Sequence, residues 1–223
     1  MRYTTSAALA EFDRWSRSYD RSILQQLFFG PSHQLLLKHL TYGDARVLDV
    51  GCGTGRFAVR VLEQNPEAHV WGLDLSAKMM AQGLTRCRPW RDRLHLVRGD
   101  SQRLPFPDDF FDVITCSHSF HHYPDQPAVV GEMFRVLRPG GRLMVIDGYR
   151  DGWWGWFIFD VIVTTAEGDV HHCSARRFRD LFRAAGFTEL RQQIRHGPLP
   201  FLLTVGRAAK PAAVKAVPLR KVA

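Results

Sequence analysis

The stretch from residue 47 to residue 56 constrains the fold of this chain more than any other. A short, mainly apolar segment at 47–50 runs directly into a turn with glycines at positions 51, 53 and 55. Glycine permits a positive φ and a close approach of the backbone to a ligand, because it has no Cβ atom. A buried strand that opens through such a turn into a helix is where α/β proteins hold nucleotide-like ligands.

Two details of this turn oppose a dinucleotide site. The pattern G-x-G-x-x-G would need its third glycine at the position that Arg56 occupies. Asp49 lies two residues before the first glycine, where a carboxylate would repel a pyrophosphate but suits a positively charged ligand. An NAD-type oxidoreductase is therefore disfavoured, and failure to bind NADH would exclude it.

Apolar segments alternate with helical patterns along most of the chain. The predicted strands lie near 45–50, 68–73, 94–98, 111–116, 141–146, 188–195 and 200–206. The predicted helices lie near 7–29, 32–40, 56–64, 77–87, 126–137 and 175–185. Strands separated by helices imply βαβ units, and therefore an α/β fold with a parallel sheet and right-handed crossovers.

Further motifs follow the glycine turn in order. Asp74 ends the second predicted strand, where a carboxylate can accept hydrogen bonds from ribose hydroxyls. Asp100 follows the third strand, and the segments 104–114 and 132–141 lead into the fourth and fifth strands. Together these motifs resemble the class I S-adenosylmethionine-dependent methyltransferases, of the type 11 and quinone-biosynthesis C-methyltransferase kind. The resemblance is strong from residue 44 to residue 147 and weak elsewhere.

This resemblance implies a Rossmann-like sheet of seven mostly parallel strands, with helices on both faces and a C-terminal antiparallel β-hairpin. It implies S-adenosylmethionine as the cofactor, with its methionine part on Asp49 and the glycines and its ribose on Asp74. Asp100 and Ser101 are expected at the adenine edge, with Leu75 beside the ring, and Ser117 and His118 next to the methionine end. The predicted cofactor-binding residues are Tyr19, Asp49, Gly51, Cys52, Gly53, Thr54, Gly55, Asp74, Leu75, Met79, Asp100, Ser101, Ser117 and His118.

Methyl transfer requires alignment of the acceptor with the methyl group, and a base only where the acceptor atom is protonated near neutral pH. The candidate bases are His118, His121 and His122 after the fourth strand, and His171 and His172 before the last helix. The alternative is that these histidines only pack or bond to the backbone. No metal site is predicted, because no set of ligands accompanies the histidines.

The N-terminal segment 12–20 resembles the lid of the quinone-biosynthesis enzymes, in which a tyrosine matching Tyr19 covers the cofactor. The alternative is an apolar helical stripe formed by Trp15, Tyr19, Ile23 and Leu27. We expect a helical lid at 1–43, a methyltransferase core at 44–207 and a flexible basic tail at 208–223.

Three of the six tryptophans fall within the core's insert at 148–172, at positions 153, 154 and 156. This Trp-rich insert follows the fifth strand, where the family places elements that recognise the acceptor. Three interpretations stay open: a wall of the acceptor pocket, a packing or dimer contact, and contact with a membrane surface.

Composition narrows the choice of partner. The net charge of +8 permits nucleic acid as a partner, but no RNA-recognition signature accompanies it. Four scattered cysteines and no signal peptide favour a cytoplasmic protein. The sequence therefore predicts methyl transfer to a small aromatic or hydrophobic acceptor, by a monomer or a homodimer. The alternatives are a non-catalytic S-adenosylmethionine-binding protein and an RNA methyltransferase.

Overall fold

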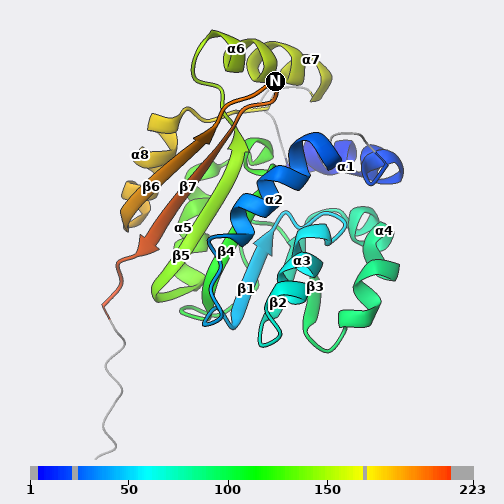
Figure 1. The fold of residues 1–223 in the computed structure, drawn as a ribbon, viewed down its shortest axis with the longest axis vertical. Coiled ribbons are helices and arrows are strands. Elements are labelled where there is room, and N and C mark those ends of the chain that lie inside the picture. The colour runs from blue at the N-terminus through cyan, green and yellow to red at the C-terminus, as the bar shows by residue number, and fades with distance from the viewer. Residues whose placement is uncertain (1–4, 22–24, 168–169, 212–223) are drawn as a thin grey trace, which may run out of the picture.

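The computed structural model describes residues 5–21, 25–167 and 170–211. A seven-stranded sheet of order β3-β2-β1-β4-β5-β7-β6 forms its centre (Figure 1). The strands are β1 (Arg46–Val50), β2 (His69–Asp74), β3 (Leu94–Arg98), β4 (Phe111–Ser117), β5 (Leu137–Gly148), β6 (Phe187–Arg195) and β7 (Phe201–Ala208). Only β7 runs opposite to the other six strands, which confirms the predicted mostly parallel sheet and its closing hairpin.

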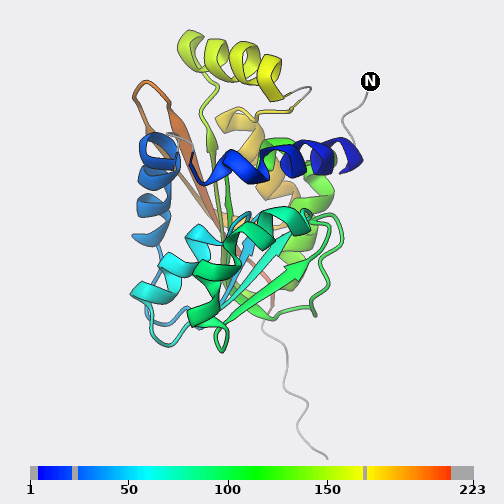
Figure 2. The same ribbon diagram turned by 90° about the vertical axis from the view of Figure 1, so that its right-hand side faces the viewer.

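Helices cover both faces of the sheet (Figure 2). On one face, α5 (Gln126–Val136) and α8 (Ala175–Ala185) bury apolar side chains such as Met133 and Phe178. On the other face, α2 (Gly30–Leu37) and α3 (Arg56–Gln64) contribute Leu36 and Phe57, and α4 (Ala77–Cys87) lies beside α3. The two apolar faces of the sheet are thus both buried, as parallel sheets require.

Local sequence signals fix the ends of these helices. The hydroxyls of Ser76 and Ser174 and the carboxylate of Asp125 accept hydrogen bonds from backbone N–H groups in the first turns of α4, α8 and α5. Gly186 ends α8 in the left-handed conformation. Short 3-10 turns, η2 (Arg88–Trp90) and η3 (Phe120–His122), follow α4 and β4.

The N-terminal segment departs from the predicted helix at 7–29. Helix α1 (Thr5–Tyr19) ends early, and a π-helical turn, η1 (Gln25–Phe29), leads directly into α2. Strand β5 is longer than predicted, because Leu137 already pairs with Phe111 before a register shift at the start of β4. The connection through 138–141 therefore belongs to the sheet.

The Trp-rich insert forms a helical arm at one end of the molecule (Figures 1 and 2). It consists of α6 (Trp153–Trp156), the π-helical turn η4 (Phe157–Val163) and α7 (Thr164–Glu167). Phe159 anchors the arm on the end of β5, where a Cβ atom at Gly148 would lie 2.5 Å from its ring. Among the described helices none is long and apolar enough to cross a bilayer.

Candidate active site

The glycine turn between β1 and α3 is shaped by its backbone. Gly51, Gly53 and Gly55 have φ values of 75°, 55° and 72°, in the left-handed region that favours glycine. A Cβ atom at Gly51 would lie 2.3 Å from the Ser119 hydroxyl, so no other residue fits there without displacing that side chain. The turn therefore presents bare backbone to the space above β1.

Asp74, at the end of β2, holds this turn in place. Its Oδ2 accepts a hydrogen bond from Gly53 N at 2.7 Å, and its Oδ1 accepts one from Ser76 N at 2.8 Å. Burial raises the pKa of this carboxyl, and the backbone N–H groups partly offset the effect. Asp74 therefore links the end of β2 to the turn that follows β1.

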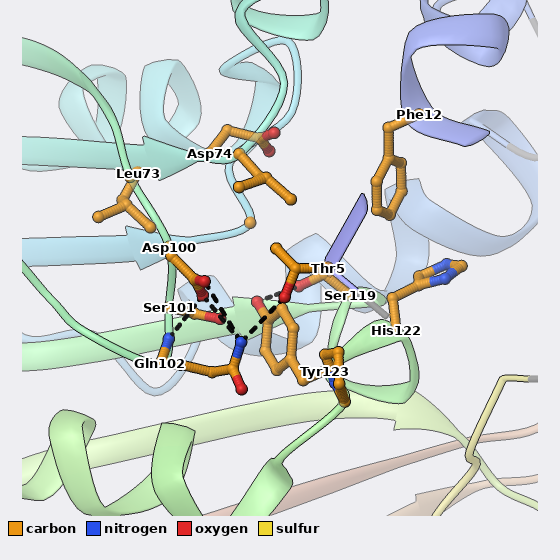
Figure 3. A pocket seen from close by; sticks show the side chains of 14 residues that line it. Thr5, Phe12, Leu73, Asp74, Asp100, Ser101, Gln102, Ser119, His122 and Tyr123 are labelled. Carbon is orange, nitrogen blue, oxygen red and sulfur yellow. Dashed lines mark hydrogen bonds between the residues drawn. The ribbon is translucent and has the colours of Figure 1, made fainter. Parts of the chain in front are cut away.

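A cavity of about 50 Å³ opens beside Asp74 at the carboxyl ends of β2 and β3 (Figure 3). Its lining includes Leu75, Asp100 and Ser101, which were all predicted at the adenine. Gln102 Nε2 donates to Asp100 and also to Thr5 Oγ1 at 3.1 Å, so the start of α1 is tied to this rim. We call this the carboxylate cavity.

A second cavity of about 120 Å³ adjoins the first, and four residues line both: Phe12, Gly51, Ser119 and His122. One wall is apolar and the other is polar. The apolar wall comprises Phe28, Phe29, Met79, Phe159, Val163 and Leu199. The polar wall comprises Ser117, His118, His121, Asp147 and His172. We call this the histidine cavity.

Asp147 organises the polar wall from the end of β5. Its carboxylate accepts from His121 Nδ1 at 2.7 Å, from His121 N at 3.0 Å and from Gly148 N at 2.7 Å. Burial alone would raise the pKa of Asp147, but its pairing with His121 outweighs burial and holds that pKa below its usual range. The carboxylate is therefore ionised, and it orients the His121 ring with Nδ1–H toward itself.

His118 presents a bare nitrogen to the same cavity. The Ser32 hydroxyl donates to Phe29 O, so it accepts the 2.8 Å hydrogen bond from His118 Nε2–H. Nδ1 is then the unprotonated nitrogen, and it is buried without a hydrogen-bond partner in the described structure. The backbone of His118 is left-handed, with φ 51°, a conformation that is strained for a non-glycine residue.

Two further polar atoms of this wall are buried without a partner among the described residues: Ser117 Oγ and His172 Nδ1. Burial lowers the pKa of His118 to about 4 and that of His172 to about 3, so both rings are neutral near pH 7. Buried polar groups are rarely left unpaired in native proteins. Three of them on one wall indicate a polar ligand in the cavity.

The N-terminal segment closes over both cavities through ionic contacts. Asp20 binds Thr54 Oγ1 at 2.8 Å, Arg56 Nε at 2.9 Å and Arg86 at 2.6 Å. Asp13 accepts from the Ser76 hydroxyl at 2.6 Å. These contacts join α1 and the residues after it to the glycine turn and to α4.

The cavities bring together most, but not all, of the predicted site residues. Asp49 lies buried beneath the turn, bonded to Thr115 Oγ1, and burial raises its pKa to about 7. Cys52 and Thr54 are also buried behind the turn, and Gly55 is the N-cap of α3. His171 is exposed and lines neither cavity, whereas its neighbour His172 does line the histidine cavity.

Only part of the predicted lid lies among the described residues. The side chains of Trp15 and Tyr19, and all of Ile23, lie outside the described residues. Leu27, the fourth residue of the alternative apolar stripe, is 63% exposed, so that stripe is not fully buried. In the insert, Phe159 and Val163 line the histidine cavity, and the exposed Trp153, Trp154 and Trp156 line neither cavity.

Several site residues escaped the sequence prediction. Phe12, Phe28 and Phe29 lie on helical segments whose pattern indicates only an apolar face. Ser32 carried no signal at all. Asp147 was visible as an acid at the end of a strand, but its partnership with His121 depends on contacts across the fold.

His121, Asp147 and His172 also have the composition of a metal site, with ligand atoms within 4.8 Å of one another. The two imidazole rings are stacked, with centroids 4.4 Å apart and planes at 16°. A metal ion lies near the plane of each imidazole that binds it, so these rings would have to reorient to share one. Asp147 is moreover already engaged by three N–H donors.

Comparisons with known proteins agree with this geometry. A family model described as a methyltransferase domain matches residues 47–141. The demethylmenaquinone methyltransferase of Listeria welshimeri is 35% identical over 150 residues, covering 65% of this chain and 64% of that protein. The ubiquinone/menaquinone biosynthesis C-methyltransferase UbiE of Paracoccus denitrificans is 37% identical over 143 residues, or 61% of this chain and 56% of that protein.

A solved structure extends the likeness to the whole fold. An S-adenosylmethionine-dependent methyltransferase from Thermotoga maritima superposes with a TM-score of 0.73 at 23% identity, covering 90% of this chain and 99% of that one. The chain spans somewhat less than two thirds of the length of the curated relatives it matches. In its fold, its glycine turn and these matches, the chain is similar to the class I S-adenosylmethionine-dependent methyltransferases.

Proposed function

We propose that this protein transfers the methyl group of S-adenosylmethionine to a small aromatic or otherwise hydrophobic acceptor. The observation that carries the proposal is the pair of adjoining cavities, one lined by carboxylates and the other by histidines and phenylalanines. S-adenosylmethionine, when bound, supplies an electrophilic methyl group on a positively charged sulfur. The chain must then align the acceptor with that methyl group and exclude water.

The carboxylate cavity would hold the adenosine. Asp74 would accept from the ribose hydroxyls, and Asp100 with Ser101 would bind the adenine edge beside Leu75. The bare backbone of Gly51 and Gly53 leaves room for the methionine part. A nearby ammonium group would favour the ionised form of Asp49, whose pKa burial raises to about 7 in the protein alone. The residues present therefore fit this cofactor.

The histidine cavity would hold the acceptor, and His121 would act as its base. His121 donates its Nδ1–H to the carboxylate of Asp147. The other ring nitrogen, Nε2, would therefore take the proton from an acceptor hydroxyl. Asp147 would then stabilise the imidazolium that forms, without taking the proton itself. His118 would act beside it as a hydrogen-bond acceptor, since its low pKa keeps it neutral.

The walls of this cavity favour a flat acceptor that carries a hydroxyl or amine. Phe28, Phe29 and Phe159 offer ring faces on one side. The unpaired Nδ1 of His118 needs a donor, which a hydroxyl supplies and a carbonyl does not. The names of the Listeria and Paracoccus relatives point to quinone precursors as their acceptors. We propose a compound of that chemical type, which reaches the cavity in its hydroxylated form.

The rest of the chain would serve this reaction as follows. Residues 1–43 would form a lid that Asp13 and Asp20 fasten, with Tyr19 over the cofactor. The core would span 44–207, and 208–223 would form the basic tail, of which 212–223 lie outside the described residues. The four free, buried cysteines suit a reducing cytoplasm. The active form would be a monomer or a homodimer.

Calorimetric titration with S-adenosylhomocysteine tests the cofactor half without an acceptor. We expect micromolar binding at one site per chain. Transfer of a radioactive methyl group to a 1,4-naphthohydroquinone then tests the acceptor half. Binding without transfer to any aromatic hydroxyl compound would favour a non-catalytic binding protein, and transfer to RNA would contradict the proposed acceptor.

A further inference from the structure

The outer surface of the Trp-rich insert is apolar. Trp153 is 77% exposed, Trp156 51% and Ile162 51%, and Trp154 and Phe157 are exposed beside them. The other exposed large apolar side chains of the described residues, such as Tyr42 and Leu84, lie apart from one another on different elements. Contiguous exposed apolar surface on a water-soluble protein marks an interaction site.

The helical arm is apolar on its inner side as well. Gly155, Ile158 and Phe159 are buried against the end of the sheet. Asp160 is paired with Arg150 at 2.8 Å. The hydroxyls of Thr164 and Thr165 donate to backbone carbonyls of the arm itself. A helix that is apolar all round is typical of a protein core or a membrane environment, and the outer side of this arm faces no core.

The arm also forms part of the histidine cavity. Phe159 and Val163 line the histidine cavity from the inner side of the arm, and Leu199 lines it from the turn between β6 and β7. Trp154 Nε1 donates to Pro198 O at 3.2 Å, which holds that turn against the arm. Figures 1 and 2 both place the arm at the end of the molecule, beyond the carboxyl edge of the sheet. Whatever the arm docks on therefore lies next to the cavity.

The overall charge of the chain favours an anionic surface. Arg195, the last residue of β6, is exposed next to the turn that Trp154 holds against the arm. The net charge of +8 attracts the chain to anionic lipid headgroups. Tryptophan rings are also enriched at the interface between lipid and water.

We propose that the arm docks on an anionic lipid bilayer, with Trp153, Trp156, Phe157 and Ile162 in the interfacial region. The acceptor then passes from the bilayer along the inner side of the arm into the histidine cavity. This second step rests on the proposed function, whereas the docking does not.

Co-sedimentation with vesicles of phosphatidylcholine and phosphatidylglycerol tests the docking on the full chain. The wild type is expected in the pellet, and its binding should weaken as salt rises. The double variant W153S/W156S should bind at least about tenfold more weakly, because two large side chains lose their apolar contact. R195E should weaken binding to vesicles with phosphatidylglycerol more than to vesicles without it. The matched control Y42S/L84S, which changes exposed apolar residues elsewhere, should bind like the wild type.

Three results would overturn the proposal. The first is a wild type that does not pellet with the vesicles at low ionic strength, and the second is a W153S/W156S variant that binds as tightly as the wild type. The third is a dimer in light scattering that W153S/W156S dissociates, without any vesicle binding. Titration with S-adenosylhomocysteine should give the same affinity for every variant. If the wild type did not bind S-adenosylhomocysteine, that result would count against the proposed function and not against the docking.

Discussion

The two adjoining cavities are built in opposite ways. The carboxylate cavity draws its polar groups from the ends of β2 and β3 and the residues directly after them, such as Asp74 and Asp100. The histidine cavity draws its walls from η1, the end of β4, the end of β5, the insert and the segment before α8. A ligand site made by strand ends follows from the topology of the sheet. A site assembled from separate segments can change its ligand while the sheet stays the same.

The electrostatics of the two cavities differ as well. Burial raises the pKa of Asp74 on one side, and it lowers the pKa of His118 and His172 on the other. One cavity is therefore set to receive hydrogen-bond donors and positive charge. The other offers neutral imidazoles and a single ionised carboxylate, Asp147. Substitutions should separate cofactor binding from transfer.

The substitution D147N should give the largest difference between the effect on methyl transfer and the effect on cofactor binding. The change removes the negative charge that orients His121 and stabilises its protonated form, so the transfer rate should fall about 100-fold to 1,000-fold. The affinity for S-adenosylhomocysteine should stay within about twofold, because Asp147 does not line the carboxylate cavity. Radioactive methyl transfer and calorimetry measure the two quantities. An unchanged transfer rate would remove His121 from the role of base.

The substitution D74A should act the other way, mainly on cofactor binding. This variant loses the acceptor for the ribose and also the bonds to Gly53 N and Ser76 N, so cofactor affinity should weaken by about 1.5–3 kcal/mol. Calorimetry with S-adenosylhomocysteine measures the change. The control D108A alters an exposed carboxylate that pairs with Arg135, and it should bind normally. Equal affinity in D74A and the wild type would refute the ribose assignment.

Acidification should act mainly through the buried histidines. The unfolded chain protonates His33, His118, His122 and His172 near their ordinary pKa of 6.5, and burial lowers the pKa of each in the folded state. The unfolded state then binds more protons below pH 6.5, so stability falls as the pH drops, by about 1 kcal/mol per unit for each ring. Asp49 acts in the opposite sense up to about pH 7, because its pKa is raised in the folded state.

The net loss of unfolding free energy between about pH 7.5 and about pH 5.5 should be about 3–4 kcal/mol. Urea denaturation at the two pH values measures it. H172Q should reduce the pH dependence, since it removes one of the buried imidazoles. A pH-independent stability would show that the rings are protonated in the folded protein.

The smallest effect is expected from S32A. Ser32 fixes the tautomer of His118 through Nε2, so its loss lets the proton move to Nδ1, where an acceptor hydroxyl should bind. The KM for the acceptor should rise about fivefold, with little change in kcat, since one hydrogen bond is worth about 1 kcal/mol. S32T keeps the hydroxyl and should restore the KM. A fall in kcat alone, unrestored by S32T, would contradict this positioning role.

The contrast between the cavities also explains what the sequence could predict. The sheet and the helices between its strands agree with the prediction in order and closely in extent, except for the helices of the insert, because the apolar periods and the glycine turn are local signals. Asp74, Asp100 and Ser101 were predictable for the same reason, since each follows a strand that the pattern identifies.

The histidine cavity was less predictable. His121 and His172 were candidates by residue type, but their contacts with Asp147 and with each other join segments far apart in the sequence. His171 and His172 were indistinguishable in sequence, and the backbone of 170–172 decides which ring is buried. The early end of α1 and the π-helical turn at η1 also depend on packing that no local pattern records.

The wall that the two cavities share has a kinetic consequence. Phe12, on α1, lines both cavities and packs edge-on against His122, with ring centroids 4.6 Å apart. We expect α1 to move before either occupant exchanges with solvent, because Phe12 borders both cavities. In the proposed reaction both substrates would then enter before the helix closes, and both products would leave at the same opening.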